Sequence, residues 1–192
     1  MHTGVIVMRN PVALRNAGFF VAGGFAAVLF IGGTAHAITD KIFAYSAPKT
    51  GYYGLDPARF VPNTDADQYS INAGVSGSYL YATNGTPCLS TGVNLPQGAK
   101  VTAIAAWYSA ANNAAVGVGL FRNSLTGTGD YAALLSSSNA SQNRKVMSKS
   151  ISNLTIDNKT HTYSVFVCFN TAGAANVFYG ARLTYTYDSA GD

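Results

Sequence analysis

Apolar and polar side chains alternate with a period of two along most of the chain after residue 37. The alternation is clearest in 100–109, 114–122 and 161–169, and a period of two is the repeat of a β-strand. Several stretches are apolar at both even and odd positions, which is expected of strands between two packed layers or against a partner. The pattern predicts eight or nine strands, the weaker pieces merging, near residues 42–46, 69–73, 78–83, 89–95, 100–109, 114–122, 131–136, 145–152, 161–169 and 176–187.

A single all-β domain accounts for this pattern. No helical periodicity continues beyond the first 37 residues, and only residues 56–59 suit one short helical turn. No repeat or linker divides residues 38–192, so we expect a two-sheet antiparallel sandwich of the jelly-roll type, preceded by a cleavable signal peptide. In the last strand we expect every second residue to face the core and its rim: Tyr179, Ala181, Leu183, Tyr185 and Tyr187.

The first 37 residues have the three parts of a secretory leader. Arg9 and Arg15 supply positive charge without any acid, an uncharged apolar run covers residues 17–31, and Ala35-His36-Ala37 is a small-x-small cleavage box. We therefore expect cleavage after Ala37 and a secreted, extracellular protein with no stable membrane anchor.

Two alternatives stay open at this end of the chain. Residues 16–39 carry no charge and are long enough to cross a bilayer, so a retained anchor is one. A start at Met8 in place of Met1 would give a shorter and more usual leader.

Charge is sparse and changes once the leader is set aside. The chain has 12 Lys and Arg against eight Asp and no Glu, a formal net charge of +4. Without the two arginines of the leader, ten Lys and Arg remain against eight Asp, a net charge of +2. They are scattered singly apart from Arg144-Lys145, whereas a phosphate backbone needs clustered basic residues. We expect no nucleic-acid partner.

The two cysteines, Cys88 and Cys168, both lie in the mature chain. An even number of cysteines in an exported domain is most simply a disulfide, because free thiols seldom persist outside the cell. Neither cysteine has a histidine near it in sequence, as a catalytic thiol would need. The sequence therefore predicts a Cys88–Cys168 bridge.

Strand and turn motifs give the chain a resemblance to known proteins. Leu80-Tyr81-Ala82, Leu95-Pro96-Gln97-Gly98-Ala99-Lys100-Val101-Thr102 and the closing Gly180-Ala181-Arg182-Leu183-Thr184-Tyr185-Thr186 resemble a group of secreted bacterial jelly-roll-like β-sandwich domains of unassigned function. The resemblance covers most of residues 45–187. It implies the sandwich fold and brings no activity with it.

Catalytic and metal-binding chemistry finds little support. His161 is the one histidine after the leader and lies in a turn, and no Gly-x-Ser-x-Gly elbow accompanies it. Asn63, Asp65 and Asp67 have the spacing of early calcium ligands, but Gln68 and Gly74 stand where an EF-hand loop requires Gly and Glu. We expect no catalytic residue, no metal ligand and no cofactor. A calcium site of another kind at the Asp-rich turn is left open.

Tyrosine is the most distinctive residue type, with 12 copies. Tyr52, Tyr53, Tyr79 and Tyr81 form pairs whose rings suit sugar stacking or an interface, and we take these four as candidate ligand-binding residues. The alternative is that such pairs line one face of a sheet and fill the core. The exposed fraction of these tyrosine side chains in the folded protein decides between a binding surface and a core.

Three classes of function remain. The first is a secreted, non-enzymatic module that acts through surface contacts with a glycan, a cell surface or another copy of itself. The second is a structural subunit of an extracellular oligomer or filament, which the strands with two apolar faces favour. The third is a hydrolase, which would need His161 or a pair of Asp side chains in a cleft.

Overall fold

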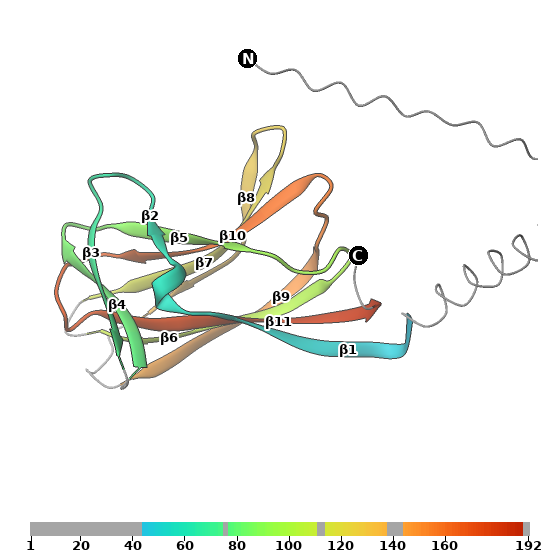
Figure 1. Cartoon of the computed structure of the whole chain (residues 1–192), viewed down its shortest axis with the longest axis horizontal. Helices are drawn as coiled ribbons and strands as arrows, with labels where there is room; N and C mark the ends of the chain where they lie inside the picture. The colour runs from blue at the N-terminus through green and yellow to red at the C-terminus, as the bar shows by residue number, and fades with distance from the viewer. Residues whose placement is uncertain (1–43, 75–76, 111–113, 138–143, 190–192) are drawn as a thin grey trace, which may run out of the picture. The chain divides into compact units, whose positions relative to one another are not determined.

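The computed structural model describes residues 44–189 apart from residues 75–76, 111–113 and 138–143 (Figure 1). The leader and its cleavage site lie outside the described residues. The described chain forms strands and one short 3-10 helix, Pro57–Arg59, at the predicted helical turn. The strands are β1 (Ala44–Leu55), β2 (Val61–Pro62), β3 (Gln68–Gly74), β4 (Gly77–Asn84), β5 (Cys88–Val93), β6 (Lys100–Ser109), β7 (Val116–Ser124), β8 (Gly129–Ser136), β9 (Lys145–Thr155), β10 (His161–Phe169) and β11 (Val177–Ser189).

The strands form two antiparallel sheets that lie one above the other in Figure 1. The first sheet has the order β3-β4-β11-β6-β9, with β1 alongside β11, and the second has the order β2-β5-β10-β7-β8. Successive strands from β4 onward mostly cross between the sheets, so that β4-β11-β6-β9 faces β5-β10-β7-β8. This exchange is the strand order of a jelly roll and confirms the predicted fold class.

The core lies between the sheets and is filled by every second residue of the central strands. Leu80 and Ile104 of the first sheet and Val118 and Val165 of the second have no exposed surface. Removing an aliphatic side chain of this size from water contributes about 1.5–3 kcal/mol. The alternate residues of these strands point out of the sandwich, and several of them are aromatic.

Strand β1 is longer than the sequence predicts. The predicted strand of residues 42–46 continues to Leu55 and pairs with β11 from Ala44↔Ser189 to Leu55↔Ala181. The Tyr52-Tyr53 pair therefore lies in a strand and points to both faces of the first sheet. None of the described helices is long and apolar enough to span a membrane.

A bulge at Gly180 overturns the expected face of Tyr179. The pairing of β11 with β6 shifts between Phe178 and Gly180, and Gly180 has φ of 128°, which a residue with a side chain rarely adopts. Phe178 and Ala181 therefore both face the core, with 0% and 4% of their surface exposed. The prediction that Tyr179 shares a face with Ala181 is wrong, because the extra residue in the strand turns its ring outward.

The Cys88–Cys168 disulfide joins two neighbouring strands of the second sheet. The two cysteines are directly opposed on β5 and β10, with their Cα atoms 4.1 Å apart. The predicted bridge is confirmed. Cys88 is the first residue of β5, so the bridge ties the start of one strand to the end of the other.

Candidate functional site

The outer face of the second sheet carries a groove of about 260 Å³. It is built by alternation, because the inward residues of β10 fill the core while Ser164, Phe166 and Cys168 point outward. β7 and β8 add aromatic residues on one side, and β5 and the residue after β2 add polar ones on the other. The lining residues are Asn63, Cys88, Ser90, Phe121, Tyr131, Ser164, Phe166 and Cys168.

Three aromatic rings form one wall of this groove. Tyr131 is 61% exposed and meets Phe121 and Phe166 edge to face, with ring centroids 5.0 and 5.4 Å away. This geometry is the favourable one for aromatic pairs and fixes the exposed tyrosine ring in place. The groove therefore presents an aromatic surface whose rings hold one another in place.

A glycine lets one of these rings lie along the sheet. Gly119 of β7 is directly opposite Phe166 of β10, and a Cβ at this glycine would overlap the Phe166 ring and lie 3.1 Å from the carbonyl oxygen of Ala133. Because the glycine has no side chain, the ring covers the backbone of β7.

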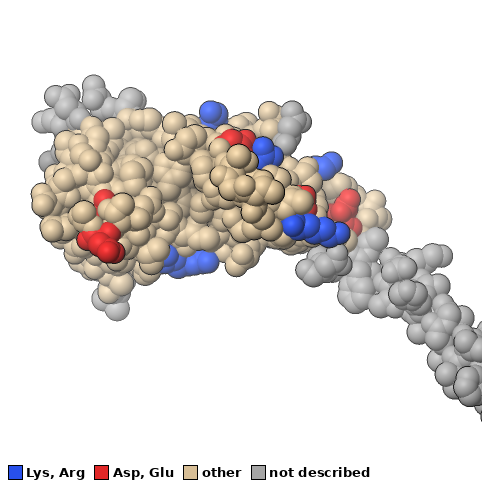
Figure 2. Space-filling view, turned by 90° about the horizontal axis from the view of Figure 1, so that it is seen from above, with Lys and Arg blue, Asp and Glu red and all other residues tan. Residues whose placement is uncertain are grey.

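The opposite wall is polar and uncharged. The Ser90 hydroxyl donates a hydrogen bond to Oδ1 of Asn63 at 2.7 Å, and the Asn63 amide carries two further N–H donors. The hydroxyl of Ser164 adds a further donor and acceptor. No lining residue is acidic or basic. Figure 2, which looks onto the molecule from the side of the second sheet, shows Lys, Arg and Asp in a few separate places on a mainly uncharged surface.

The outer face of the first sheet carries a second aromatic surface, of a different kind. Tyr79 lies with its ring centroid 6.3 Å from both Tyr81 and Tyr179. The Arg144 guanidinium is stacked over Tyr179 at 3.9 Å from the ring centroid. The hydroxyl of Tyr79 accepts a hydrogen bond of 2.7 Å from the Asn72 amide, which fixes the orientation of its ring.

Further along the same face, one arginine lies between two aromatic rings. Arg182 of β11 is 4.9 Å from the ring of Tyr52 and 5.5 Å from that of Trp107. Its register partners are Ala105 on β6 and Gly54 on β1, two small residues that leave room for the guanidinium. Tyr52 is 63% exposed, so this stack is open to solvent.

The four tyrosines predicted as ligand-binding residues do not form one site. Tyr52, Tyr79 and Tyr81 share the outer face of the first sheet. Tyr53 points the other way, packs against the core and accepts a hydrogen bond of 3.1 Å from Arg59. None of the four lines the groove of the second sheet.

Sequence reasoning missed the groove because it followed tyrosine pairs within single strands. Phe121, Tyr131 and Phe166 come from three strands and meet only through their pairing. The signal in the sequence was the Gly117-x-Gly119 spacing inside an apolar strand. Glycine in a strand interior often marks the place where another group approaches the backbone.

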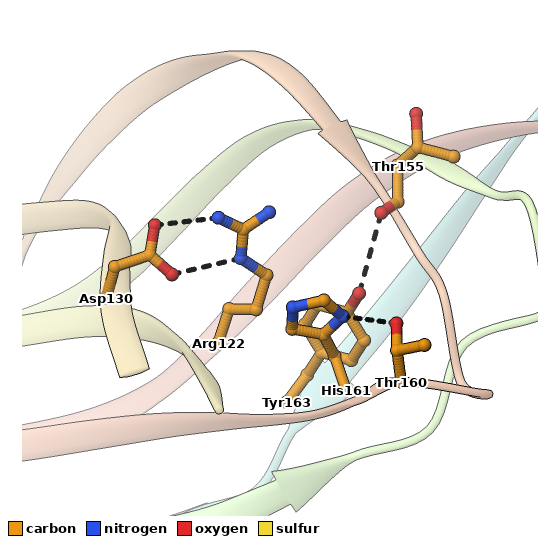
Figure 3. A network of polar contacts seen from close by, with 6 residues as sticks. All are labelled: Arg122, Asp130, Thr155, Thr160, His161 and Tyr163. Carbon is orange, nitrogen blue, oxygen red and sulfur yellow. Dashed lines mark hydrogen bonds and ion pairs between the residues drawn. The ribbon is translucent and has the colours of Figure 1, made fainter. Parts of the chain in front are cut away.

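Polar contacts at one end of the sandwich surround His161 (Figure 3). Arg122 and Asp130 form a bidentate ion pair with both N···O distances at 2.9 Å. Hydrogen bonding from the guanidinium lowers the pKa of the Asp130 carboxyl. The hydroxyl of Tyr163 accepts from the backbone N–H of Asp157 at 2.9 Å and reaches the carbonyl oxygen of Thr155.

The hydrogen bonds of His161 do not resemble those of a catalytic triad. Its Nδ1 lies 2.7 Å from the hydroxyl of Thr160, and that hydroxyl donates its proton to the Asp157 carboxylate. This bond lowers the pKa of Asp157. In a triad the carboxylate orients the histidine and the histidine accepts the hydroxyl proton. Here the hydroxyl donates its hydrogen bond to the carboxylate instead, and these contacts hold the turn before β10.

In the Asp-rich turn, side-chain oxygens accept hydrogen bonds from other groups of the protein. Oδ2 of Asp67 accepts the backbone N–H of Thr64 at 3.0 Å, and Oδ1 of Asn63 accepts from Ser90. Within residues 44–189, outside the gaps, no three His, Cys, Asp or Glu side chains gather as metal ligands would. Asp65 adds a single carboxylate to this turn.

The fold and these faces define a jelly-roll β-sandwich with two exposed aromatic surfaces. No family model and no curated protein matches the sequence. Among solved structures, the C-terminal family 6 carbohydrate-binding module of the laminarinase LamC from Zobellia galactanivorans is 16% identical, with a TM-score of 0.47 over 70% of this chain and 99% of the module.

Two further solved structures are similar at lower identity and lower TM-score. A xylan-binding module of family 15 is 14% identical, with a TM-score of 0.46 over 71% of this chain and 97% of the module. A chain of the infectious bursal disease virus Gx strain is 8% identical, with a TM-score of 0.39 over 75% of this chain and 33% of the viral chain. Function therefore has to be argued from the residues of this chain.

Proposed function

We propose that this protein is a secreted, non-enzymatic module that binds a neutral glycan in the groove of the second sheet. The observation that carries the proposal is the pairing of a three-ring wall with an uncharged polar wall. The C–H faces of a sugar ring pack on aromatic rings, and its hydroxyls exchange hydrogen bonds with amides and hydroxyls. Tyr131 would supply the stacking surface, and Asn63, Ser90 and Ser164 the polar contacts.

The dimensions of the groove support contact with a short stretch of a chain. Its volume of about 260 Å³ lies just below the range of roughly 300–1,000 Å³ typical of sites that enclose a small molecule. A site of this size and openness covers one side of its ligand. Secretion is supported by the leader sequence and by the disulfide whose cysteines line the groove.

Titration calorimetry with neutral hexasaccharides built from glucose, xylose or galactose tests the proposal. We expect at least one of them to bind, and Tyr131→Ala to weaken its binding about tenfold or more, as loss of an anchor aromatic does. Tyr45→Ala is the matched control, because Tyr45 is also exposed, at 40%, and meets Tyr187 edge to face outside the groove.

A melting curve must accompany each variant to separate lost binding from lost folding. Failure of every neutral hexasaccharide to bind would contradict the proposal. So would equal loss of binding in Tyr131→Ala and Tyr45→Ala.

Self-association through the same face is the second candidate. Val61, Tyr131 and Leu134 are 59%, 61% and 51% exposed and all lie on the outer side of the second sheet. Apolar side chains grouped in this way are typical of interfaces. If sedimentation shows a dimer that Leu134→Lys converts to a monomer, and no neutral glycan binds, the groove belongs to an interface between copies of the chain.

A further inference from the structure

The arginines on the outer face of the first sheet are held by aromatic rings and not by acids. Arg182 lies between Tyr52 and Trp107, and Arg144 lies over Tyr179. Stacking covers the flat faces of a guanidinium and leaves its N–H groups at the edge, in the plane where a carboxylate binds with two hydrogen bonds. Both guanidinium groups are therefore held close to rings that do not neutralise their charge.

Among the residues that the structure describes, no salt bridge joins either arginine to a carboxylate. The ion pair found between described side chains is Arg122–Asp130, which lies at the other sheet. Along β11 the next acidic residue after Arg182 is Asp188, six positions on, a distance of about 20 Å in an extended strand. The two arginines on this face are therefore stacked on rings without forming an ion pair with a described carboxylate.

We propose that this face is a second binding surface, which takes acidic glycans whose sugar rings carry carboxylates. The face carries two kinds of group, flat aromatic rings and arginine side chains that can bind a carboxylate with two hydrogen bonds. A uronic acid residue has a sugar ring that suits the first and a carboxylate that suits the second. The sugar ring would pack on Trp107, Tyr52 or Tyr79, and its carboxylate would bind Arg182 or Arg144. The surface is independent of the neutral groove, which lies on the opposite sheet.

The charge distribution favours a uronate chain over a nucleic acid. Neutralising a phosphate backbone takes about six to ten basic contacts in a typical site, and this face presents two stacked arginines. A neutral glycan would leave both guanidinium groups unpaired. A chain with one carboxylate on each sugar supplies an anion at each arginine and a ring at each aromatic residue.

The test compares hexagalacturonate with the same hexamer after reduction of its carboxyl groups. In Tyr131→Ala, which lacks the anchor ring of the neutral groove, we expect the acidic hexamer to bind, its affinity to fall as salt is added, and the reduced hexamer to bind about tenfold or more weakly. Arg182→Gln and Arg144→Gln should each weaken binding of the acid by a similar factor. Arg59→Gln is the matched control, since Arg59 also stacks on a tyrosine, the core-facing Tyr53.

A second set of variants separates the two surfaces. Tyr131→Ala should leave hexagalacturonate binding unchanged, whatever its effect on neutral hexamers. The inference is overturned if hexagalacturonate does not bind, if both arginine variants bind it like the wild type, or if the reduced hexamer binds Tyr131→Ala, in which the neutral groove has lost its anchor ring, as tightly as the acidic hexamer does. Loss of acid binding in Tyr131→Ala, or tighter binding of a single-stranded oligothymidylate than of the uronate, overturns it too.

Discussion

Replacing Gly119 with alanine should damage the groove and the stability of the domain together. The new Cβ would occupy the place of the Phe166 ring and would come within 3.1 Å of the carbonyl oxygen of Ala133. The ring can swing away, but it then leaves Tyr131, its edge-to-face partner at 5.4 Å. The backbone oxygen has to move by a few tenths of an ångström.

The change in the free energy of unfolding is the sum of two losses and one gain. Overpacking costs about 1–3 kcal/mol and a lost aromatic pair about 0.5–1.5 kcal/mol. Alanine stabilises by about 0.4–1 kcal/mol through the lower entropy of the unfolded chain. The net loss of stability is about 0.5–4 kcal/mol, centred near 2 kcal/mol, and a loss of about 2 kcal/mol lowers Tm by roughly 4–8 °C in a domain of this size.

The matched control is Gly92→Ala, in β5 of the same sheet. An added Cβ at Gly92 meets nothing within 4 Å, so this variant should be as stable as the wild type or slightly more stable. Calorimetric melting measures both variants, and titration with the neutral hexasaccharide that binds the wild type measures the groove. Equal melting temperatures for the two variants, or unchanged glycan binding in Gly119→Ala, would refute the reasoning.

Three further predictions concern the fold. Reduction of the Cys88–Cys168 bridge, 80 residues apart, should cost up to about 4.5 kcal/mol in denaturant unfolding, and coincident curves with and without reductant would contradict this. Leu80→Ala should cost about 2–5 kcal/mol in the same assay because Leu80 has no exposed surface, and a loss under 1 kcal/mol would place it outside the core. The hydrogen bond from Thr160 lowers the pKa of Asp157 in the folded protein. The ionised Asp157 therefore stabilises the fold above about pH 4, the pKa of an Asp in the unfolded chain, and this stabilisation is lost as the pH falls through the folded pKa. Between pH 6 and pH 3 the melting temperature of Thr160→Val should fall less steeply than that of the wild type. Parallel plots of melting temperature against pH for the two proteins would contradict this.

Local patterns predict the fold well where strands are regular. The alternation in residues 100–109 and 161–169 gives the bounds of β6 and β10, and the even number of cysteines gives the bridge. Both signals need no knowledge of how strands pair. The extension of β1 to Leu55 was missed because glycines interrupt its alternation, and its length comes from pairing with β11.

The candidate surfaces depend on pairing and were predicted only in part. Tyr52, Tyr79 and Tyr81 do lie on an outer face, but Arg182 and Trp107 join Tyr52 through the register of β1, β11 and β6. The outward turn of Tyr179 follows from one residue, Gly180, whose positive φ has no signature in the hydrophobic pattern. Strict alternation cannot reveal a bulge of this kind.

The pairing of Ala44 with Ser189 brings the first and last described strands to the same end of the sandwich. A linker between these two residues would close the chain into a ring without disturbing a strand. New termini could then open in the exposed turn at residues 125–128, between β7 and β8. Circular permutation of this sort, or insertion into a loop of a host protein, would keep the strand pairing of both sheets and leave their outer faces uncovered.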